Sequence, residues 1–312
     1  MAKFSGLKGT GFISRATVAA ITAALVGTTT GAVAADNPQG AAEAAASAGT
    51  FQSAPAMEAA PLAATTSAAA EVRALEAVSG SNLYFYEPNG SGGYNARELL
   101  TSDWGDVKNA QQADNDGDGV ADDLWVWTTD GYLGYASSEA DAGITVGGGW
   151  NIYNKVLSPG NLGGAAAPDM IARDSAGTLW IYLGYGNGKL TGRTKVGSGW
   201  NIYNQIAGVG DLSGDGKTDI VARDTAGVLW LYKGTGDYKA PFSGRTKVGS
   251  GWGVYNTLVG VGDLDGDGLS DLIARDSSGA LYRYSGTGNA AAPYKARVKI
   301  GAGGWNTYRL MF

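Results

Sequence analysis

The sequence of 312 residues contains no cysteine and no histidine. Without cysteine, the chain can form no disulfide bond and can carry no lipid on an N-terminal cysteine. Without histidine, it cannot use Ser-His-Asp or Cys-His catalysis, and it cannot bind zinc through imidazole. The 23 basic residues form no run of the kind that binds nucleic acid, and the net charge is −6.

Long apolar runs are also missing, apart from one short stretch near the start. Residues 1–34 have the pattern of a secretory signal peptide: Lys3, Lys8 and Arg15 precede an apolar core over residues 18–26, and Ala32-Val33-Ala34 fits a cleavage site. This core is shorter than the roughly 20 residues that a transmembrane helix needs. We therefore expect a secreted protein with no membrane span, and removal of the three basic residues takes the net charge from −6 to −9.

Residues 35–80 are rich in Ala, Ser, Thr and Pro and poor in aromatic residues. This composition predicts a flexible, disordered leader that cannot bury a core. Within the leader, residues 66–80 could form a weak helix or could donate a strand to the domain that follows. The sequence leaves both alternatives open.

A repeat fills residues 81–312. Its marker is a tryptophan that recurs at intervals of 46, 50, 52 and 53 residues, at Trp104, Trp150, Trp200, Trp252 and Trp305. Short strands rich in aromatic and β-branched residues, bounded by glycine-rich turns, follow in a constant order, and no segment has a helical period. Four short strands in a unit of about 50 residues predict an all-β protein, a β-propeller with four-stranded blades.

The number of blades follows from the two ends of the repeat. The repeat begins at an aromatic strand and stops just after Trp305, so its ends are complementary parts of one unit. Pairing them predicts five blades and removes the exposed sheet edges. A four-bladed ring with loose ends and a larger ring made by association remain alternatives.

An acidic loop occurs in three of the units, at residues 114–122, 211–219 and 263–271. A degenerate copy at residues 161–169 has Gly163 and Ala165 at its third and fifth positions. Oxygen atoms at positions 1, 3, 5 and 9 can converge on one hard cation, position 7 can add a backbone carbonyl, and glycine at position 6 allows the sharp turn. Carboxylates this close repel one another without a cation, so the loops predict Ca²⁺ sites.

These loops, each followed by a strand of the Asp-Leu-Ile-Ala-Arg type, resemble the FG-GAP or VCBS repeats of the integrin α-subunit propeller. The resemblance covers residues 83–312 and implies calcium within the blades. The side-chain ligands that it implies are Asp114, Asp116, Asp118, Asp122, Asp211, Ser213, Asp215, Asp219, Asp263, Asp265, Asp267 and Asp271. Val120, Lys217 and Leu269 would each add a carbonyl. Integrin propellers usually have seven blades, and the count of five is similar to tachylectin, a sugar-binding propeller.

The tryptophan markers have two interpretations. They could fill the wedge between neighbouring blades, or they could form repeated ligand pockets, because aromatic faces stack on sugars and asparagine binds hydroxyl groups. The possible ligand-binding residues are Trp150, Asn151, Tyr153, Trp200, Asn201, Tyr203, Trp252, Tyr255, Trp305 and Tyr308. The Ala-Arg-Asp triplets that end at Asp174, Asp224 and Asp276 are predicted to be strand-end ion pairs or turn caps.

Together these features favour a secreted, calcium-stabilised propeller that acts as a monomeric binding or adhesion module for a glycan or an extracellular protein. The alternative is an extracellular enzyme, a lyase or hydrolase acting on polysaccharides, built on the same ring. A glycosidase needs two carboxylates about 5–10 Å apart, and no unique acid/base pair stands out. We therefore expect no catalytic residues and no cofactor other than calcium.

Overall fold

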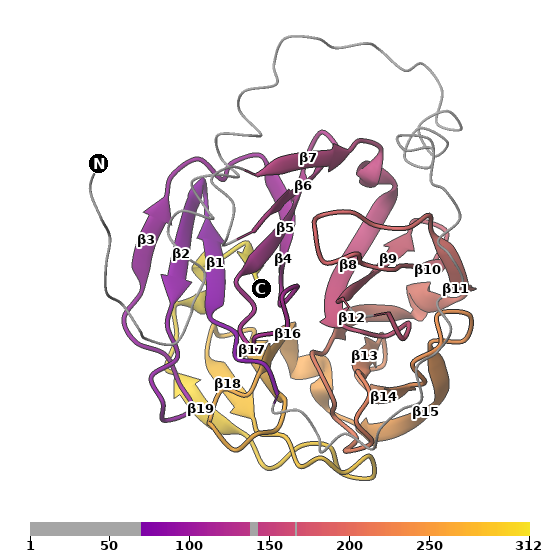
Figure 1. Ribbon diagram of the computed structural model, residues 1–312. Coiled ribbons are helices and arrows are strands. Elements are labelled where there is room, and N and C mark those ends of the chain that lie inside the picture. The colour runs from indigo at the N-terminus through magenta and orange to yellow at the C-terminus, as the bar shows by residue number, and fades with distance from the viewer. Residues whose placement is uncertain (1–69, 138–142, 166) are drawn as a thin grey trace.

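The computed structural model describes residues 70–137, 143–165 and 167–312 (Figure 1). It is a ring of five four-stranded antiparallel sheets, which confirms the prediction of an all-β propeller with five blades. The predicted signal peptide and residues 35–69 of the leader lie outside the described residues. Within the described residues the only helices are short 3-10 turns, and none could span a membrane.

Each blade runs from an innermost strand on the ring axis to an outer strand. The first blade is β4 (Val107–Ala113), β5 (Asp123–Thr128), β6 (Leu133–Ala136) and β7 (Ile144–Gly147). The second is β8 (Tyr153–Gly160), β9 (Asp169–Asp174), β10 (Leu179–Tyr182) and β11 (Thr194–Gly197). The third is β12 (Tyr203–Ala207), β13 (Ile220–Asp224), β14 (Leu229–Gly234) and β15 (Phe242–Gly249). The fourth is β16 (Tyr255–Gly262), β17 (Asp271–Asp276), β18 (Leu281–Tyr284) and β19 (Val298–Gly301).

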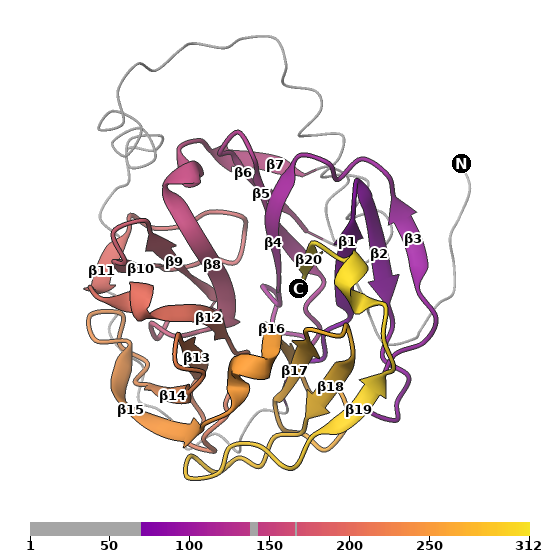
Figure 2. The same ribbon diagram turned by 180° about the vertical axis from the view of Figure 1, so that it is seen from behind.

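The closing blade joins the two ends of the described chain. Its order is β20 (Leu310–Met311), β1 (Leu75–Ser79), β2 (Asn82–Tyr86) and β3 (Glu98–Thr101). The C-terminal strand β20 pairs with β1 next to the ring axis (Figure 2). The alternative of a strand over residues 66–80 is thus correct for β1, and the propeller begins before the predicted boundary at residue 81. This strand is buried on both faces, which a flexible leader would not allow.

The hairpin turn after the second strand of each complete blade shows how local sequence sets the fold. In the second blade, Asp174 Oδ1 accepts a hydrogen bond from the Thr178 amide at 2.9 Å, and Gly177 has φ of 81°. A side chain there would be strained, and its Cβ would also lie 2.9 Å from Asn201 Cβ. The predicted role of the aspartate as a turn cap is therefore confirmed.

The hydrophobic core is divided among the five junctions between blades. Each of five clusters of buried residues contains side chains from two neighbouring blades. At the junction of the second and third blades, for example, Trp200 packs in one cluster with Ile171, Ile181 and Ile220. Burial of each such side chain stabilises the fold by about 1.5–3 kcal/mol. Stability thus depends on how the blades meet, because a single sheet has little core of its own.

A cation also bridges every junction. Arg173 on β9 donates from Nη1 to the Trp200 carbonyl at 2.9 Å and to the Tyr203 carbonyl, at the entrance to β12. The equivalent bonds at the other junctions run from Arg223 to Trp252 and Tyr255, from Arg275 to Trp305 and Tyr308, from Arg309 to Trp104 and Val107, and from Lys108 to Tyr153. We call these five contacts the cation clamps. The arginines of the Ala-Arg-Asp triplets hold carbonyl groups, so the predicted strand-end ion pairs are wrong for them.

The clamps predict a ranking of stability. Arg223→Met removes the charged donor from two carbonyls at a buried site, so we expect the free energy of unfolding to fall by about 2–4 kcal/mol. Lys108→Met removes one bond from an exposed lysine and should cost less than about 1 kcal/mol. Denaturant titration of both variants measures the difference. Equal losses, or an unchanged Arg223→Met protein, would contradict the role given to the clamp.

The closing blade also contains a buried glutamate, Glu76. It lies on β1, is fully buried, and neither of its carboxylate oxygens has a hydrogen-bond partner among the described residues. Burial raises the pKa of Glu76 to about 8. The folded protein therefore keeps this carboxyl protonated at neutral pH, whereas the unfolded chain releases the proton above about pH 4.5.

This difference makes stability depend on pH. The contribution of the protonated carboxyl is fully present below about pH 4.5 and is lost as the pH rises toward 8. Glu76→Gln removes the titration, so it should leave stability nearly unchanged at pH 4.5 and raise it at pH 8 by about 4 kcal/mol. Parallel unfolding curves of both proteins across this range test the prediction. A constant difference at every pH would refute it.

Candidate metal sites

The acidic loops all connect the innermost strand of a blade to its second strand, so they lie on one face of the ring. Each loop needs two glycines in the left-handed region. In the third blade Gly214 and Gly216 have φ of 81° and 80°, and the other two loops repeat this pattern. The aspartate at position 1 then caps the turn: Asp211 accepts the Gly214 and Gly216 amides at 2.7 and 2.6 Å. Asp114 and Asp263 accept the equivalent amides.

Two of the loops bring three carboxylates together. In the first blade these are Asp114, Asp116 and Asp118, and in the fourth blade they are Asp263, Asp265 and Asp267. Within each group, one oxygen from every residue lies within 4.8 Å of the others. Two oxygens that bind one calcium ion at about 2.4 Å can be at most about 4.8 Å apart, so both groups fit this ion.

Among the three acidic loops, the loop of the third blade offers a metal ion the fewest carboxylate ligands. It has Ser213 at position 3, so it lacks one carboxylate, and its remaining ligand candidates are Asp211 and Asp215. The Ser213 hydroxyl lies 3.4 Å from Asp211 Oδ1. This loop therefore offers less negative charge to a cation than the other two.

The aspartate at position 9 has a different role from the others. Asp219 is fully buried, and its carboxylate accepts the Leu212 amide at 3.0 Å and the Gly234 amide at 2.8 Å. Asp271 accepts the equivalent Leu264 and Gly286 amides. The degenerate loop keeps this arrangement at Asp169 although its third and fifth positions offer no ligand. Position 9 therefore ties the loop to the next loop of its own blade, whether or not a metal is bound.

The first loop departs from the predicted spacing. Asp123 begins β5 and is buried, and strand pairing makes it equivalent to Asp169 on β9. Its carboxylate accepts the Tyr135 hydroxyl at 2.8 Å. Asp122, the predicted residue, is only partly buried. The loop is one residue longer than the others, so counting nine positions selected the wrong aspartate for this place.

The residues at position 7 were predicted to supply carbonyl oxygens. Their amides donate to the position-5 carboxylate: Val120 to Asp118 at 2.8 Å, Lys217 to Asp215 at 3.2 Å and Leu269 to Asp267 at 3.1 Å. The Val120 carbonyl also accepts the Asp122 amide at 3.1 Å. These contacts fold the end of each loop back over its carboxylates.

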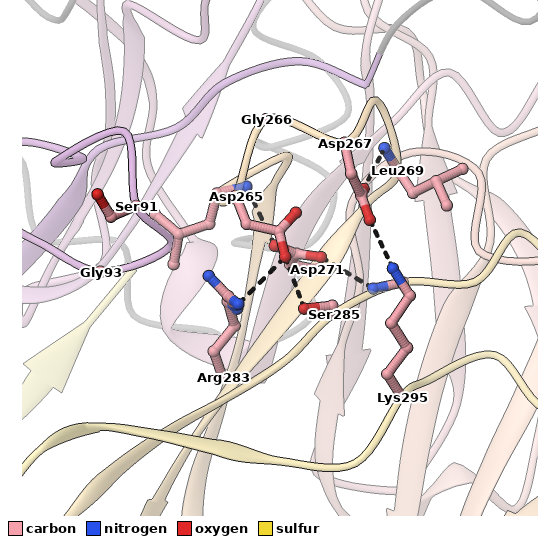
Figure 3. Close-up of polar contacts among 12 residues, drawn as sticks. Ser91, Gly93, Asp265, Gly266, Asp267, Leu269, Asp271, Arg283, Ser285 and Lys295 are labelled. Carbon is pink, nitrogen blue, oxygen red and sulfur yellow. Dashed lines mark hydrogen bonds and ion pairs between the residues drawn. The ribbon is translucent and has the colours of Figure 1, made fainter.

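Basic side chains that sequence reasoning missed lie against two of the loops. In the fourth blade, Lys295 Nζ is 2.7 Å from Asp267 Oδ2 and Arg283 Nη2 is 3.1 Å from Asp265 Oδ2 (Figure 3). Lys233 Nζ lies 2.9 Å from Asp215 Oδ2 in the third blade. They come from the third strand or the loop after it, so only the folded blade reveals them. These cations occupy the oxygens that a metal ion would need.

Three carboxylates of the acidic loops have a raised pKa. Burial raises the pKa of Asp114 to about 6, and Glu71 adds to the rise. Burial likewise raises the pKa of Asp219 to about 6 and that of Asp271 to about 7, with neighbouring aspartates contributing. Protons therefore compete with any cation at mildly acidic pH. In the first loop, Asp114, Asp116 and Asp118 have no ion pair to a basic side chain in the part of the chain that the structure describes, so this group of carboxylates is the most favourable of the three for a cation.

The possible ligand-binding residues lie at the blade junctions. The rings of Trp150, Trp200 and Trp252 are at most 8 % exposed, while Trp305 is half-buried. The tyrosine hydroxyls pair with a second tyrosine of the same blade, as in Tyr153 with Tyr182 at 2.5 Å. Tyr203, Tyr255 and Tyr308 repeat this pair with Tyr232, Tyr284 and Tyr86. These contacts are those of packed side chains in the wedge between blades.

The two asparagines of this set are exposed and lie beside a hairpin turn of the preceding blade. Asn201 approaches Gly177, and Asn151 approaches Gly131 in the same way. The adjoining amides of Trp200 and Trp150 donate to the carbonyls of these glycines at 2.9 Å. The structure thus brings each asparagine to a junction and leaves its amide at the surface.

A cavity of about 400 Å³ lies on the ring axis among the innermost strands. No aspartate or glutamate side chain is among its lining residues within the described part of the chain. A hydrolase of the two-carboxylate type would therefore find no acid/base pair in this cavity.

Comparison with known proteins gives one family. The FG-GAP-like repeat matches residues 166–222 and 211–274, which include the acidic loops of the third and fourth blades. No curated protein matches the sequence.

Several solved structures are similar in part. Prp20p from Saccharomyces cerevisiae is 8 % identical, with 71 % of this chain and 59 % of that chain covered and a TM-score of 0.35. Human WBSCR16 is 11 % identical, with 70 % and 63 % covered and a TM-score of 0.33. A mutant of AofleA from Arthrobotrys oligospora is 9 % identical, with 75 % and 73 % covered and a TM-score of 0.44. The chain thus spans about three fifths of the length of the first two.

The competing lysine yields a prediction for calcium. Lys295→Met removes the ammonium group from Asp267, so the fourth-blade loop should bind calcium a few-fold more tightly. Calorimetric titration with calcium measures the change, and Lys299→Met, an exposed lysine on β19, is the matched control. Asp267→Asn should have the opposite effect. An affinity that is the same in Lys295→Met and the original protein would show that the ion pair does not compete.

Proposed function

The chain is a five-bladed FG-GAP repeat propeller, and we propose that it is a secreted binding or adhesion module that calcium stabilises. A propeller with these repeats fits a binding module in general. The observation that carries the proposal is the pair of loops in which three carboxylates meet within 4.8 Å. Calcium bound there would neutralise the repulsion within each loop and would hold its two strands together.

The expected affinity is that of extracellular sites. Loops of this kind bind calcium at roughly 0.1–1 mM, so at millimolar calcium each site adds on the order of 1 kcal/mol to stability. Three occupied loops would contribute a few kcal/mol, which is a large part of the net stability of a typical domain. A secreted chain without cysteine has no disulfide bonds, so this contribution would replace them.

Secretion is supported by the order of features at the start of the sequence. Basic residues, a short apolar core and a small-residue cleavage pattern follow one another within residues 1–34. The calcium concentration outside cells also suits weak sites. The ligand of the module would be a glycan or a protein in that environment, and several equivalent junctions around the ring could bind it with additive strength.

The proposal predicts a calcium-dependent melting temperature. The full chain should melt at a temperature several degrees higher in 2 mM calcium than in excess chelator, because three sites add about 1 kcal/mol each. The increase should shrink as the pH falls from 7.5 to about 5.5, since Asp114, Asp219 and Asp271 take up protons in this range.

Matched variants separate metal binding from folding. Asp114→Asn with Asp118→Asn should remove one calcium ion per chain in calorimetry, whereas Asn161→Ala in the degenerate loop should remove none. Magnesium at the same concentration controls for ionic strength. An identical melting temperature with calcium and with chelator would rule out calcium as the stabilising ion, and screening for glycans would then need no calcium.

A further inference from the structure

The cavity on the ring axis has a character that neither the acidic loops nor the blade packing explains. Five of its lining residues are lysine or arginine and none is aspartate or glutamate, although the protein as a whole has a net charge of −6. Its volume of about 400 Å³ lies within the range of small-molecule sites. A basic cavity in an acidic protein favours an anionic occupant.

Four of the five cations already have partners. Lys108, Arg275 and Arg309 form cation clamps. Arg73 bonds to Glu71 at 2.7 Å and to the Ser158 carbonyl at 3.3 Å. Lys155 has neither a hydrogen bond nor an ion pair to any residue in 70–137, 143–165 or 167–312, so its ammonium group is the one left for a ligand.

Lys155 is also held in an unfavourable place for an unpaired charge. Burial lowers its pKa, and the nearby guanidinium groups of Arg173 and Arg223 lower it further. Removing a charge from water is costly unless a partner of opposite sign replaces the lost solvation. An anion in the cavity would supply that partner.

Polar groups surround Lys155 at the same level of the axis. Strand pairing makes Lys155 equivalent to Asn109, Gln205, Thr257 and Leu310 on the other innermost strands, and all five line the cavity. Their side chains provide two amides, one hydroxyl, one ammonium and one apolar group. They differ from blade to blade. This ring of side chains can therefore recognise an asymmetric ligand.

Two further lining residues have buried polar atoms with no partner among the described residues. The Trp127 Nε1 donor and the Gln112 Oε1 acceptor each lack a hydrogen bond, and both side chains are at most 2 % exposed. Native proteins seldom leave such atoms unpaired without water or a ligand nearby. They add two unsatisfied polar atoms to the residues that line the cavity.

The cavity is closed toward the acidic loops. Val72 pairs with Val120 in the first blade and with Gly262 in the fourth, so the segment before β1 crosses that face of the ring. The Arg73 side chain continues the crossing to Ser158 of the second blade. A ligand would therefore enter from the opposite face, where the innermost strands begin, and would not touch the metal loops.

We propose that this cavity binds a monosaccharide-sized carboxylate, a hexuronic acid that is either free or the terminal residue of an acidic glycan. Lys155 binds the carboxylate. The side-chain oxygens of Asn109, Gln205 and Thr257 accept hydrogen bonds from hydroxyl groups of the ligand, because their own donor groups already bond to the Val156 carbonyl, the Asn256 carbonyl and Asn256 Oδ1. A single free ammonium group suits a single negative charge, and the arginines that would favour phosphate are engaged by carbonyl groups. The lack of acidic lining side chains disfavours amino acids, whose ammonium group would be unpaired. The assignment names a ligand class beyond the proposed function and does not require calcium.

Calorimetric titration of the full chain with sodium glucuronate and sodium galacturonate tests the proposal. All titrations contain excess chelator, so calcium cannot bridge a uronate to the acidic loops. We expect binding of at least one uronate and none of glucose or galactose. Lys155→Met should weaken binding about ten- to hundred-fold, because it removes a charge-assisted hydrogen bond. Lys299→Met, an exposed lysine on β19, should bind like the original protein.

Two additional measurements keep the result interpretable. The melting temperature of Lys155→Met should equal or exceed that of the original protein, since the lost ammonium group is partly desolvated and has no partner among the described residues; if the variant does not fold, Thr257→Val and Gln205→Leu replace it. Titration with oligouronides tests which form of the sugar acid binds. A similar affinity for monomer and oligomer indicates that the cavity binds a free sugar acid or the terminal residue of a chain. Equal binding of glucose and glucuronate, undiminished binding by Lys155→Met, or no uronate binding at millimolar concentration would overturn the proposal.

Discussion

The contact on which the ring depends is a cation of one blade bonded to backbone carbonyls at the start of the next. Five such clamps occur, one for each junction, and the hydrophobic clusters between blades lie directly beside them. Apolar packing alone is non-directional, so it would let neighbouring sheets slide. A charged donor with fixed carbonyl acceptors sets the position of one blade against the next.

The clamp also shows how a repeat tolerates local change. Three blades use an arginine on the second strand, with an asparagine of the innermost strand holding its Nε. Where the second strand has Trp127 or Val78 at that place, the cation comes from the innermost strand, as Lys108, or from the residue just before it, as Arg309. The carbonyls are satisfied in every case, because an unpaired buried carbonyl is expensive. The requirement is for a donor at the junction, and the strand that supplies it can vary.

The acidic loops and the cavity show two uses of charge in one scaffold. In the loops, the position-9 carboxylate accepts backbone amides, and in the first and fourth blades the carboxylates at positions 1, 3 and 5 lie together where a cation would bind. The cavity is lined by five cations and no carboxylate, and one of these cations, Lys155, has no hydrogen bond or ion pair among the described residues. The crossing segment around Val72 separates the two regions. The repeated residues therefore build the frame, while residues that occur once, such as Glu76 and Lys155, give individual blades their chemistry.

The sequence determined the class of fold, the five blades and the order of strands, because the tryptophan spacing and the turn residues are local and recur in every unit. It also located the acidic loops, whose glycines and aspartates act within nine residues. The sequence could not show that Asp123, and not Asp122, is the equivalent of Asp169 in the first loop, since that depends on the register of β5. It could not choose between a helix and the strand that forms at residues 75–79. Nor could it reveal the lysine and arginine partners of the loops, the clamps across junctions or the cation-lined cavity. These features join residues from different strands and blades, and only closure of the ring brings them within bonding distance.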